Sequence, residues 1–494
     1  MATRVRKDVW KLSRIATWEP TILWYAKGIR EMQKLGIANP SSWRYQAAIH
    51  DYDADSEALR PPNDPLPPAA ERKKYWRQCQ HFSWYFLPWH RWFLLYFEQI
   101  VAAAVVKAGG PPGWSLPYWN YSDTSNPNRL KLPPAFIAAK LPDGTPNPLR
   151  VANRARGNDG AAVGNDTHAD LGCLREDQYT ADPMGGDPGY GGPKTKFNHD
   201  SGDVVGALES VPHGSMHNRV GDWMSGFSTA GLDPIFWLHH SNIDRLWVVW
   251  RNRDPGNVDP ADKAWPKMSF PFHDGTGKAV APLVGGAVDT VKLGYEYEDT
   301  SDPLSAGGGL FAAAAAGPAE VKVAKKSKAK PEMVGASEQA TPLTGGPTSA
   351  SVDVSAPSGP AALAAAAEET TPQRVFLNVE NVKGDGTPNT YAVYVNVPEG
   401  EDPRDRSDLF VGILPLFGVR EATRGSDKHA GEGLHYSFDI TELAARMKDN
   451  ADWDPENLKV TFVPDDEPET AGLAAAVDVD APRFEVGRVS LYVK

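Results

Sequence analysis

The chain has 494 residues, 41% of them hydrophobic, which is enough for more than one domain with a buried core. Its formal net charge of −12 argues against a nucleic-acid-binding protein, whose binding surface would be basic. The two cysteines are too few for a disulfide scaffold, the N-terminus has no apolar signal-peptide core, and no apolar run could span a bilayer, so we expect a cytoplasmic protein that does not bind membranes.

Composition divides the chain into three parts. Residues 1–300 are rich in tryptophan, and their helical stretches are separated by loops containing Pro and Gly, so we expect a mainly α domain. Residues 301–372 hold few large apolar residues and predict a flexible low-complexity linker. Residues 373–494 alternate apolar and polar side chains between turn residues, which is typical of an all-β sandwich.

The first histidine cluster lies in the stretch HFSWYFLPWHRWFLLYFE, which contains His81 and His90. On one regular helix the two rings would point in opposite directions, because each residue turns the helix by about 100°. We therefore expect His90 in the first turns of a helix and His81 in the segment before it. A third ligand must come from elsewhere, and His50, at the end of WRYQAAIH, precedes the cluster.

The second cluster combines HGSMH with LDPIFWLHHSNIDRLW. His213 and His217 are spaced to share one face of a helix, and Glu209 is expected on the same face, one turn earlier. Of the adjacent pair His239 and His240, only one can readily bind the same ion, because neighbours on a helix point in different directions. Two trios of imidazoles in an apolar setting suit copper or zinc, and two such sites in one domain favour a copper pair.

Two neighbours of these clusters each have two interpretations. Cys79 is either a small buried apolar side chain or a thiol linked to an imidazole carbon of His81. Asp244, one turn after His240, either orients an imidazole or forms an ordinary ion pair with Arg245.

These stretches, together with LPYWNYSD, ESVPHGSMH and LGYEYED, resemble the type-3 copper proteins of the tyrosinase and catechol oxidase (polyphenol oxidase) family. The motifs and the C-terminal strands are similar to those of plant enzymes, whereas the missing N-terminal disulfides suggest a bacterial-type relative. The resemblance implies a four-helix bundle that holds two copper ions, uses O2 as co-substrate and is followed by a shielding β-sandwich. The copper ligands that it implies are His50, His81 and His90 for the first ion and His213, His217 and His240 for the second.

The resemblance also implies roles for residues around the copper ions. Cys79 and His81 would form a thioether, while Cys173 matches no motif. Glu209 would hold a water near the second copper, and Phe227 would gate the pocket. Gly214 stands where strong monophenolases often carry Asn, so the resemblance implies weak hydroxylation of monophenols.

The expected activity is the oxidation of o-diphenols to o-quinones with O2, with small phenols as substrates. A full tyrosinase or an o-aminophenol oxidase is the alternative that uses the same site, and a hemocyanin-like oxygen carrier is a more distant one. The sequence leaves open whether the chain forms a homo-oligomer. The apolar pair Leu416 and Phe417 either occupies the substrate pocket or is a buried strand end, and on the first interpretation removal of the chain after about Thr300 should raise activity.

Overall fold

The fold is described from a computed structural model. The described residues are 3–61, 63–182, 186–197, 203–305, 330–354, 374–387, 389–425, 430–449, 457–465 and 484–494, and all structural statements concern these. The chain divides into two compact units. The first unit contains Met1–His81, Tyr85–Asp177 and Met216–Ala306, and the second contains Phe82–Trp84, Gln178–Ser215 and Gly307–Lys494.

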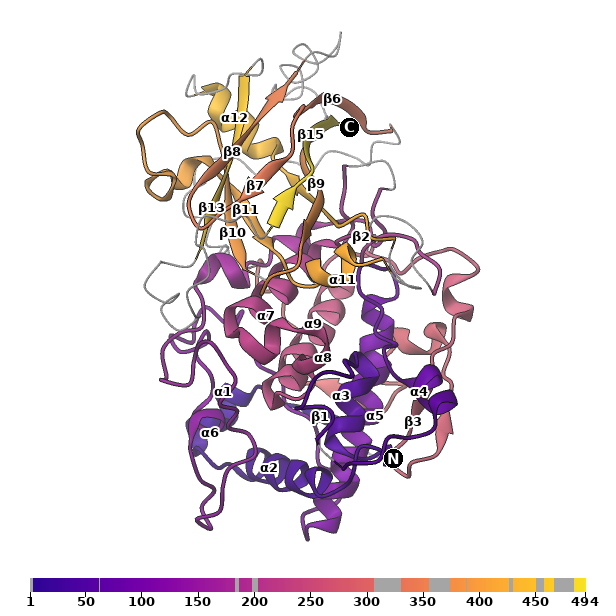
Figure 1. Ribbon diagram of the computed structural model, residues 1–494. Helices are drawn as coiled ribbons and strands as arrows, with labels where there is room; N and C mark the ends of the chain where they lie inside the picture. Colours follow the sequence, from indigo (N-terminus) through magenta and orange to yellow (C-terminus); the bar gives the residue numbers. More distant parts are fainter. Residues whose placement is uncertain are drawn as a thin grey trace. The chain divides into compact units, whose positions relative to one another are not determined.

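Helices dominate the first unit, as the sequence predicts. The α-helices are α1 (Val9–Ile15), α2 (Pro20–Gln33), α3 (Trp43–His50), α4 (Ala69–Tyr75), α5 (Phe86–Lys107), α6 (Pro134–Ile137), α7 (Ser215–Val220), α8 (Phe227–Ala230) and α9 (Pro234–Arg253). Single 3-10 turns connect them: η1 (Asp166–Ala169), η2 (Gly172–Arg175), η4 (Asp222–Ser225), η5 (Trp265–Lys267) and η6 (Val284–Val288). Helix α5 packs against both α2 and α9, and α2 packs against α3 (Figure 1). Among the described residues, no helix is both long and apolar enough to cross a membrane.

Helix α2 approaches α5 closely at Gly28. A Cβ atom there would lie 3.0 Å from Val105 and 3.2 Å from Val101, both on α5. A side chain at this position would therefore push the two helices apart, because buried helix contacts have little spare volume.

The start of α9 is fixed by Asp233. Its side chain accepts a hydrogen bond from the amide of Ile235, and Pro234 occupies the first helical position, where its missing N–H costs nothing. The same carboxylate forms a fully buried ion pair with Arg154, at 2.6 Å. Helix α9 therefore begins at a defined residue.

Two short sheets also belong to the first unit. Strands β1 (Arg4–Arg6) and β5 (Tyr295–Tyr297) pair in parallel, and β3 (Phe272–His273) pairs with β4 (Ala279–Val280) in the antiparallel sense. The β1–β5 pair joins the beginning of the unit to its end.

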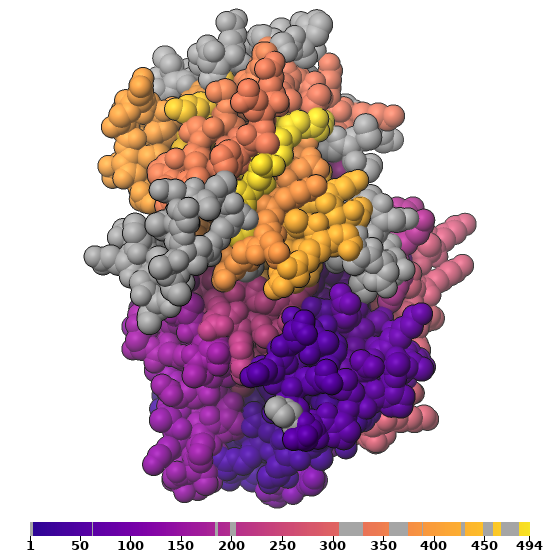
Figure 2. Space-filling view, viewed as in Figure 1, coloured from indigo at the N-terminus to yellow at the C-terminus, as the bar shows by residue number. Residues whose placement is uncertain are grey.

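The second unit is built on one 11-stranded network. Its strands are β2 (Asp203–Val204), β6 (Glu332–Ala336), β7 (Thr341–Leu343), β8 (Thr348–Asp353), β9 (Val375–Gly384), β10 (Thr390–Val395), β11 (Phe410–Pro415), β12 (Leu434–Asp439), β13 (Asn457–Pro464), β14 (Phe484–Val486) and β15 (Arg488–Val493). The order is β11-β10-β13-β8-β6-β15-β9-β12-β2, and β14 pairs with β7 and β9. Short helical segments lie between strands, namely η7 (Pro403–Asp405), η8 (Ser407–Leu409), α11 (Val419–Thr423) and α12 (Thr441–Asp449). The yellow C-terminal residues lie between coral and orange segments in Figure 2, as the pairing of β15 with β6 and β9 requires.

Part of the expected linker at 301–372 is wrong. Strands β6, β7 and β8 fall inside that range, and β8 pairs along its length with β13. These strands are poor in large apolar residues, but Val334, Leu343 and Val352 are buried, so alternate positions still supply the core. Residues 306–329 and 355–372 of the expected linker lie outside the described part of the chain.

The segment Gln178–Ser215 also packs in the second unit, which the sequence does not reveal. Strand β2 extends the sheet by pairing in parallel with β12. Two ion pairs hold the same segment, Arg374 with Asp187 at 2.9 Å and Lys494 with Asp182 at 2.6 Å. The β-strands therefore support the segment that ends in Glu209 and His213.

Candidate metal centre

The first candidate metal group consists of His50, Cys79, His81 and His90. One ligand atom from each lies within 4.8 Å of those of the others. His50 is the last residue of α3, His90 lies in the first turns of α5, and His81 precedes that helix, so the predicted arrangement is confirmed. The Cys79 sulfur lies 3.6 Å from His81 Nε2 and 3.4 Å from His90 Nε2.

The second group consists of His213, His217, His239 and His240, again with ligand atoms within 4.8 Å of one another. The Nε2 atoms of His217 and His240 are 3.2 Å apart. All four side chains are buried. The two groups meet where the ring of His240 stacks on that of His90, with centroids 4.4 Å apart and planes inclined by 9°.

The expectation of one regular helix through Glu209, His213 and His217 is wrong. Glu209–Gly214 forms a π-type turn (η3) in which Val211 has extended φ and ψ, and α7 begins only at Ser215. Glu209 and His213 are nevertheless linked, because the Glu209 carbonyl accepts a hydrogen bond from His213 Nδ1 at 3.1 Å.

Four imidazoles share one hydrogen-bonding pattern. In each, Nδ1 donates to a backbone carbonyl: His50 to Phe227 at 2.8 Å, His90 to Phe86 at 2.8 Å, His213 to Glu209 at 3.1 Å and His217 to Met224 at 2.6 Å. A carbonyl oxygen can only accept, so these rings carry their proton on Nδ1 and present the lone pair of Nε2 as a ligand. Burial lowers the pKa of His90 and of His217 well below the usual value, and the neighbouring imidazoles lower both pKa values further. Buried, neutral rings with a fixed tautomer fit a metal such as copper.

The adjacent residues His239 and His240 have different surroundings. His239 lies beside Tyr121 and His217, with ring centroids 5.7 and 4.7 Å away, and burial lowers its pKa to about 3. His240 contacts rings of both groups, with centroids 4.4 Å from that of His90 and 5.3 Å from that of His217. The geometry therefore favours His240 over His239 as the ligand.

The Glu209 carboxylate is held by a backbone amide. Both of its carboxylate oxygens are 2.9 Å from the backbone nitrogen of Phe82, the residue that follows His81. Phe82 has φ = 53°, an uncommon conformation for a non-glycine residue, and this turns its amide toward the carboxylate. Residue types could not predict this contact, because it depends on a backbone amide.

Phe227 and Phe417 each pack on a ligand ring. The Phe227 ring lies 4.1 Å from that of His81, between centroids. The ring of Phe417, two residues after β11, lies 5.4 Å from that of His213 in an edge-on arrangement. Leu416 is fully buried.

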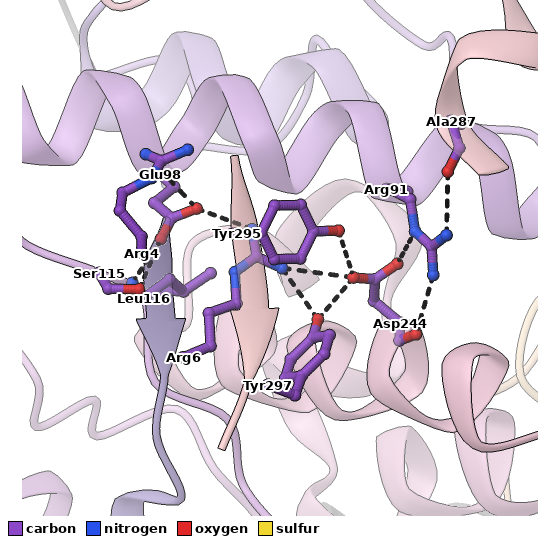
Figure 3. A network of polar contacts seen from close by, with 10 residues as sticks. All are labelled: Arg4, Arg6, Arg91, Glu98, Ser115, Leu116, Asp244, Ala287, Tyr295 and Tyr297. Carbon is purple, nitrogen blue, oxygen red and sulfur yellow. Dashed lines mark hydrogen bonds and ion pairs between the residues drawn. The ribbon is translucent and has the colours of Figure 1, made fainter. Parts of the chain in front are cut away.

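Asp244 takes part in neither of the two interactions expected for it, and that prediction is wrong. One oxygen accepts from Arg91 Nε at 2.5 Å, and the other from Arg6 at 3.3 Å, Tyr295 at 2.7 Å and Tyr297 at 2.5 Å (Figure 3). The reason is that β1 and β5, which pair with each other, place Arg6, Tyr295 and Tyr297 beside Asp244. Arg91 follows His90 directly, and Asp244 lies one turn after His240, so the ion pair joins the two helices that carry these ligands.

Comparison with known proteins settles the family. The common central domain of tyrosinase matches residues 40–253, and a domain of unknown function (DUF7868) matches residues 330–494. Tyrosinase HcTyr1 of Hahella sp. (strain CCB-MM4) is 33% identical over 503 residues, covering 99% of this chain and 99% of that protein. The chain belongs to the tyrosinase family. It is therefore an oxidoreductase of the type-3 copper class, and the two histidine groups are the residues that could hold the metal.

Other members of the tyrosinase family resemble parts of the chain or its fold. (+)-Larreatricin hydroxylase of Larrea tridentata is 31% identical over 245 residues, or 45% of this chain and 39% of that protein. The chain spans less than half the length of several such plant relatives. The structure of latent apple tyrosinase matches with a TM-score of 0.60 at 22% identity, covering 100% of this chain and 97% of that one, which supports the fold of a helical domain followed by a sheet domain.

Proposed function

We propose that the protein oxidises o-diphenols to o-quinones with O2 at a pair of copper ions and hydroxylates monophenols weakly. His50, His81 and His90 would hold one ion, and His213, His217 and His240 the other. The observation that carries this proposal is the shared orientation of the rings, in which backbone carbonyls take Nδ1 and leave Nε2 for metal. Small phenols as partners and a cytoplasmic location complete the proposal, and a homo-oligomer is compatible with it.

The bound copper pair would supply the oxygen and electron-transfer chemistry, and the chain would supply position and proton transfer. Glu209, fixed by the Phe82 amide, would accept the phenolic proton through a water molecule. The Phe227 ring, packed on His81, would limit which phenols approach the first ion. Gly214 has no side chain to orient that water, which supports weak activity on monophenols.

Copper content and substrate range test the proposal together. The copper-loaded protein is expected to bind two ions per chain and to oxidise catechol. It should turn over dihydroxyphenylalanine much faster than tyrosine. Comparable rates on both substrates would favour a full tyrosinase, which the name of the Hahella relative supports. Two bound copper ions without turnover, before or after limited proteolysis, would favour an oxygen carrier and contradict the proposal.

A thioether between Cys79 and His81 forms part of the proposed function. The bond would join the sulfur to an imidazole carbon, with loss of the thiol hydrogen and one ring hydrogen as O2 is reduced at the copper ions. The sulfur already lies 3.6 Å from His81 Nε2. The peptide containing both residues is expected to be two hydrogens lighter after loading with copper in air, as measured by mass spectrometry. An unchanged mass, with activity present, would contradict the cross-link.

The proposal also assigns a covering role to Leu416 and Phe417. Burying a phenylalanine side chain is worth about 1.5–3 kcal/mol, so Phe417→Ala should raise catechol oxidation by about 10- to 100-fold by weakening the cover. Phe410→Ala is the matched control, because Phe410 lies on the same strand, β11, and packs on Tyr394. An equal effect of both substitutions would argue against a covering role. Truncation after Thr300 is a weaker test, because it also removes the partners of Asp182 and Asp187.

A further inference from the structure

Gly214 occupies a position where space, and not backbone conformation, limits the size of the side chain. It is absent from the glycines with positive φ in the described chain, so an L-residue could adopt its backbone. A Cβ atom there would lie 3.2 Å from the Glu209 carbonyl oxygen, 3.4 Å from Phe417 Cβ and 3.5 Å from Pro415 Cγ. The first distance is already tight, and larger side chains would extend into the same neighbours.

Phe417 and Pro415 cannot move aside easily, because hydrogen bonds hold the segment Pro415–Phe417, which we call the tip. At its start, Pro415 pairs with Thr390 across β11 and β10, and the Tyr436 hydroxyl donates to the Pro415 carbonyl. Within it, the Leu416 amide donates to the Asn389 carbonyl at 3.1 Å. After it, the chain turns at Gly418, whose φ of 81° suits glycine.

The turn that carries Gly214 is fixed as well. The carbonyl of Glu209 accepts from His213, and the Glu209 carboxylate is held by the Phe82 amide. Val211, in the same turn, packs on a buried cluster that includes Ile413 and Tyr394. The turn and the tip are therefore two fixed surfaces that meet at a residue without a side chain.

We propose that Gly214 is a positioning residue for the tip. The missing side chain lets the tip seat against the turn, with Phe417 on the ring of His213. A side chain that extends beyond its Cβ would overlap Phe417 and Pro415 and displace the tip, so this position controls whether the tip stays packed on the turn. The inference deepens the proposed function, since seating matters for activity only if the tip covers the metal site.

Position 214 therefore has two linked effects. A polar side chain such as Asn would assist the proton-accepting Glu209, but it would also occupy the space of Phe417 and Pro415. Gly214→Asn alone cannot separate these effects. Gly214→Val can, because valine fills the space and offers no hydrogen bond.

Amide hydrogen exchange in the metal-free, full-length protein tests directly whether the tip stays packed against the turn that carries Gly214. The Leu416 amide is the reporter, and amides between β9 and β15 report global stability. Gly214→Val and Gly214→Asn should each raise exchange at Leu416 by about tenfold or more and leave the β9–β15 amides unchanged, because overpacking opens the contact locally. Gly346→Val is the matched control, because a Cβ at Gly346 meets no atom within 4 Å.

The outcomes separate this inference from the proposed function. Unchanged exchange at Leu416 in folded Gly214→Val overturns the inference, whatever the enzyme oxidises. Faster exchange at Leu416 in the Gly214 variants would support the inference even if the copper-loaded wild type does not oxidise catechol. The missing oxidation would contradict the proposed function alone. If Gly214→Val does not fold, Gly214→Ser replaces it, because its hydroxyl extends beyond the Cβ, and an exchange rate at Leu416 that is not raised by about threefold overturns the inference.

Discussion

Replacement of His240 by alanine is expected to remove bound copper and to lower catechol oxidation by more than about 100-fold. Residues that only support a metal ligand already cost about 10- to 100-fold when replaced, so loss of a ligand should exceed that range. The ring of His240 is 3.2 Å from His217 between Nε2 atoms and stacks on His90. Its loss therefore disturbs both groups, and copper analysis of the loaded protein should show fewer than two ions per chain.

His239→Ala is the matched control for this prediction. The two residues are adjacent on α9 and equally buried, so both substitutions remove the same number of atoms from the same core. His239→Ala should retain both copper ions and keep most of the activity, although it will cost some stability by leaving a cavity. Loss of copper in His239→Ala with retention in His240→Ala would reverse the assignment of the ligand.

The arrangement of the first histidine group could be predicted because it depends on local periodicity. His81 and His90 are out of phase on a helix, and a run of apolar residues after His90 predicts α5, so one residue had to precede the helix. The β-strands of the second unit beyond residue 373 follow from alternation in the same way. Short-range patterns of this kind are the part of a fold that sequence alone records.

Other features depend on distant segments and could not be predicted. Val211 is an exception, because it has extended φ and ψ where Pro212 follows it, and a proline disfavours the helical region for the residue before it. Glu209 is fixed by the amide of Phe82, 127 positions earlier. Because almost every residue has a backbone amide, the residue types do not indicate this contact. Strands β6 to β8 have weak apolar patterns and form because β13 and β15 supply partners.

Replacement of Asp244 by alanine is expected to lower the free energy of unfolding of the first unit by about 3–5 kcal/mol, as is typical when one partner of a buried ion pair is removed. Arg6 and Arg91 are fully buried, and Asp244 and Glu98 are the two buried carboxylates that balance them (Figure 3). Without Asp244, one guanidinium charge is left uncompensated in the core. Asp143→Ala, at an exposed ion pair with Arg30, is the control and should change stability far less than Asp244→Ala.

The dependence of this effect on pH follows from the same network. Burial by itself would raise the pKa of Asp244, but Arg91 and Arg6 hold the pKa of this carboxyl below its usual value. A carboxyl whose pKa is lowered by folding stabilises the native state above its unfolded pKa of about 3.9, and this contribution is lost as the pH falls through the folded value. Urea unfolding should therefore show a large difference between wild type and Asp244→Ala at neutral pH that shrinks below about pH 4. A difference that is small at neutral pH, or that grows on acidification, would contradict a stabilising role of this network. Apolar packing would then be the main stabilising interaction between α5 and α9.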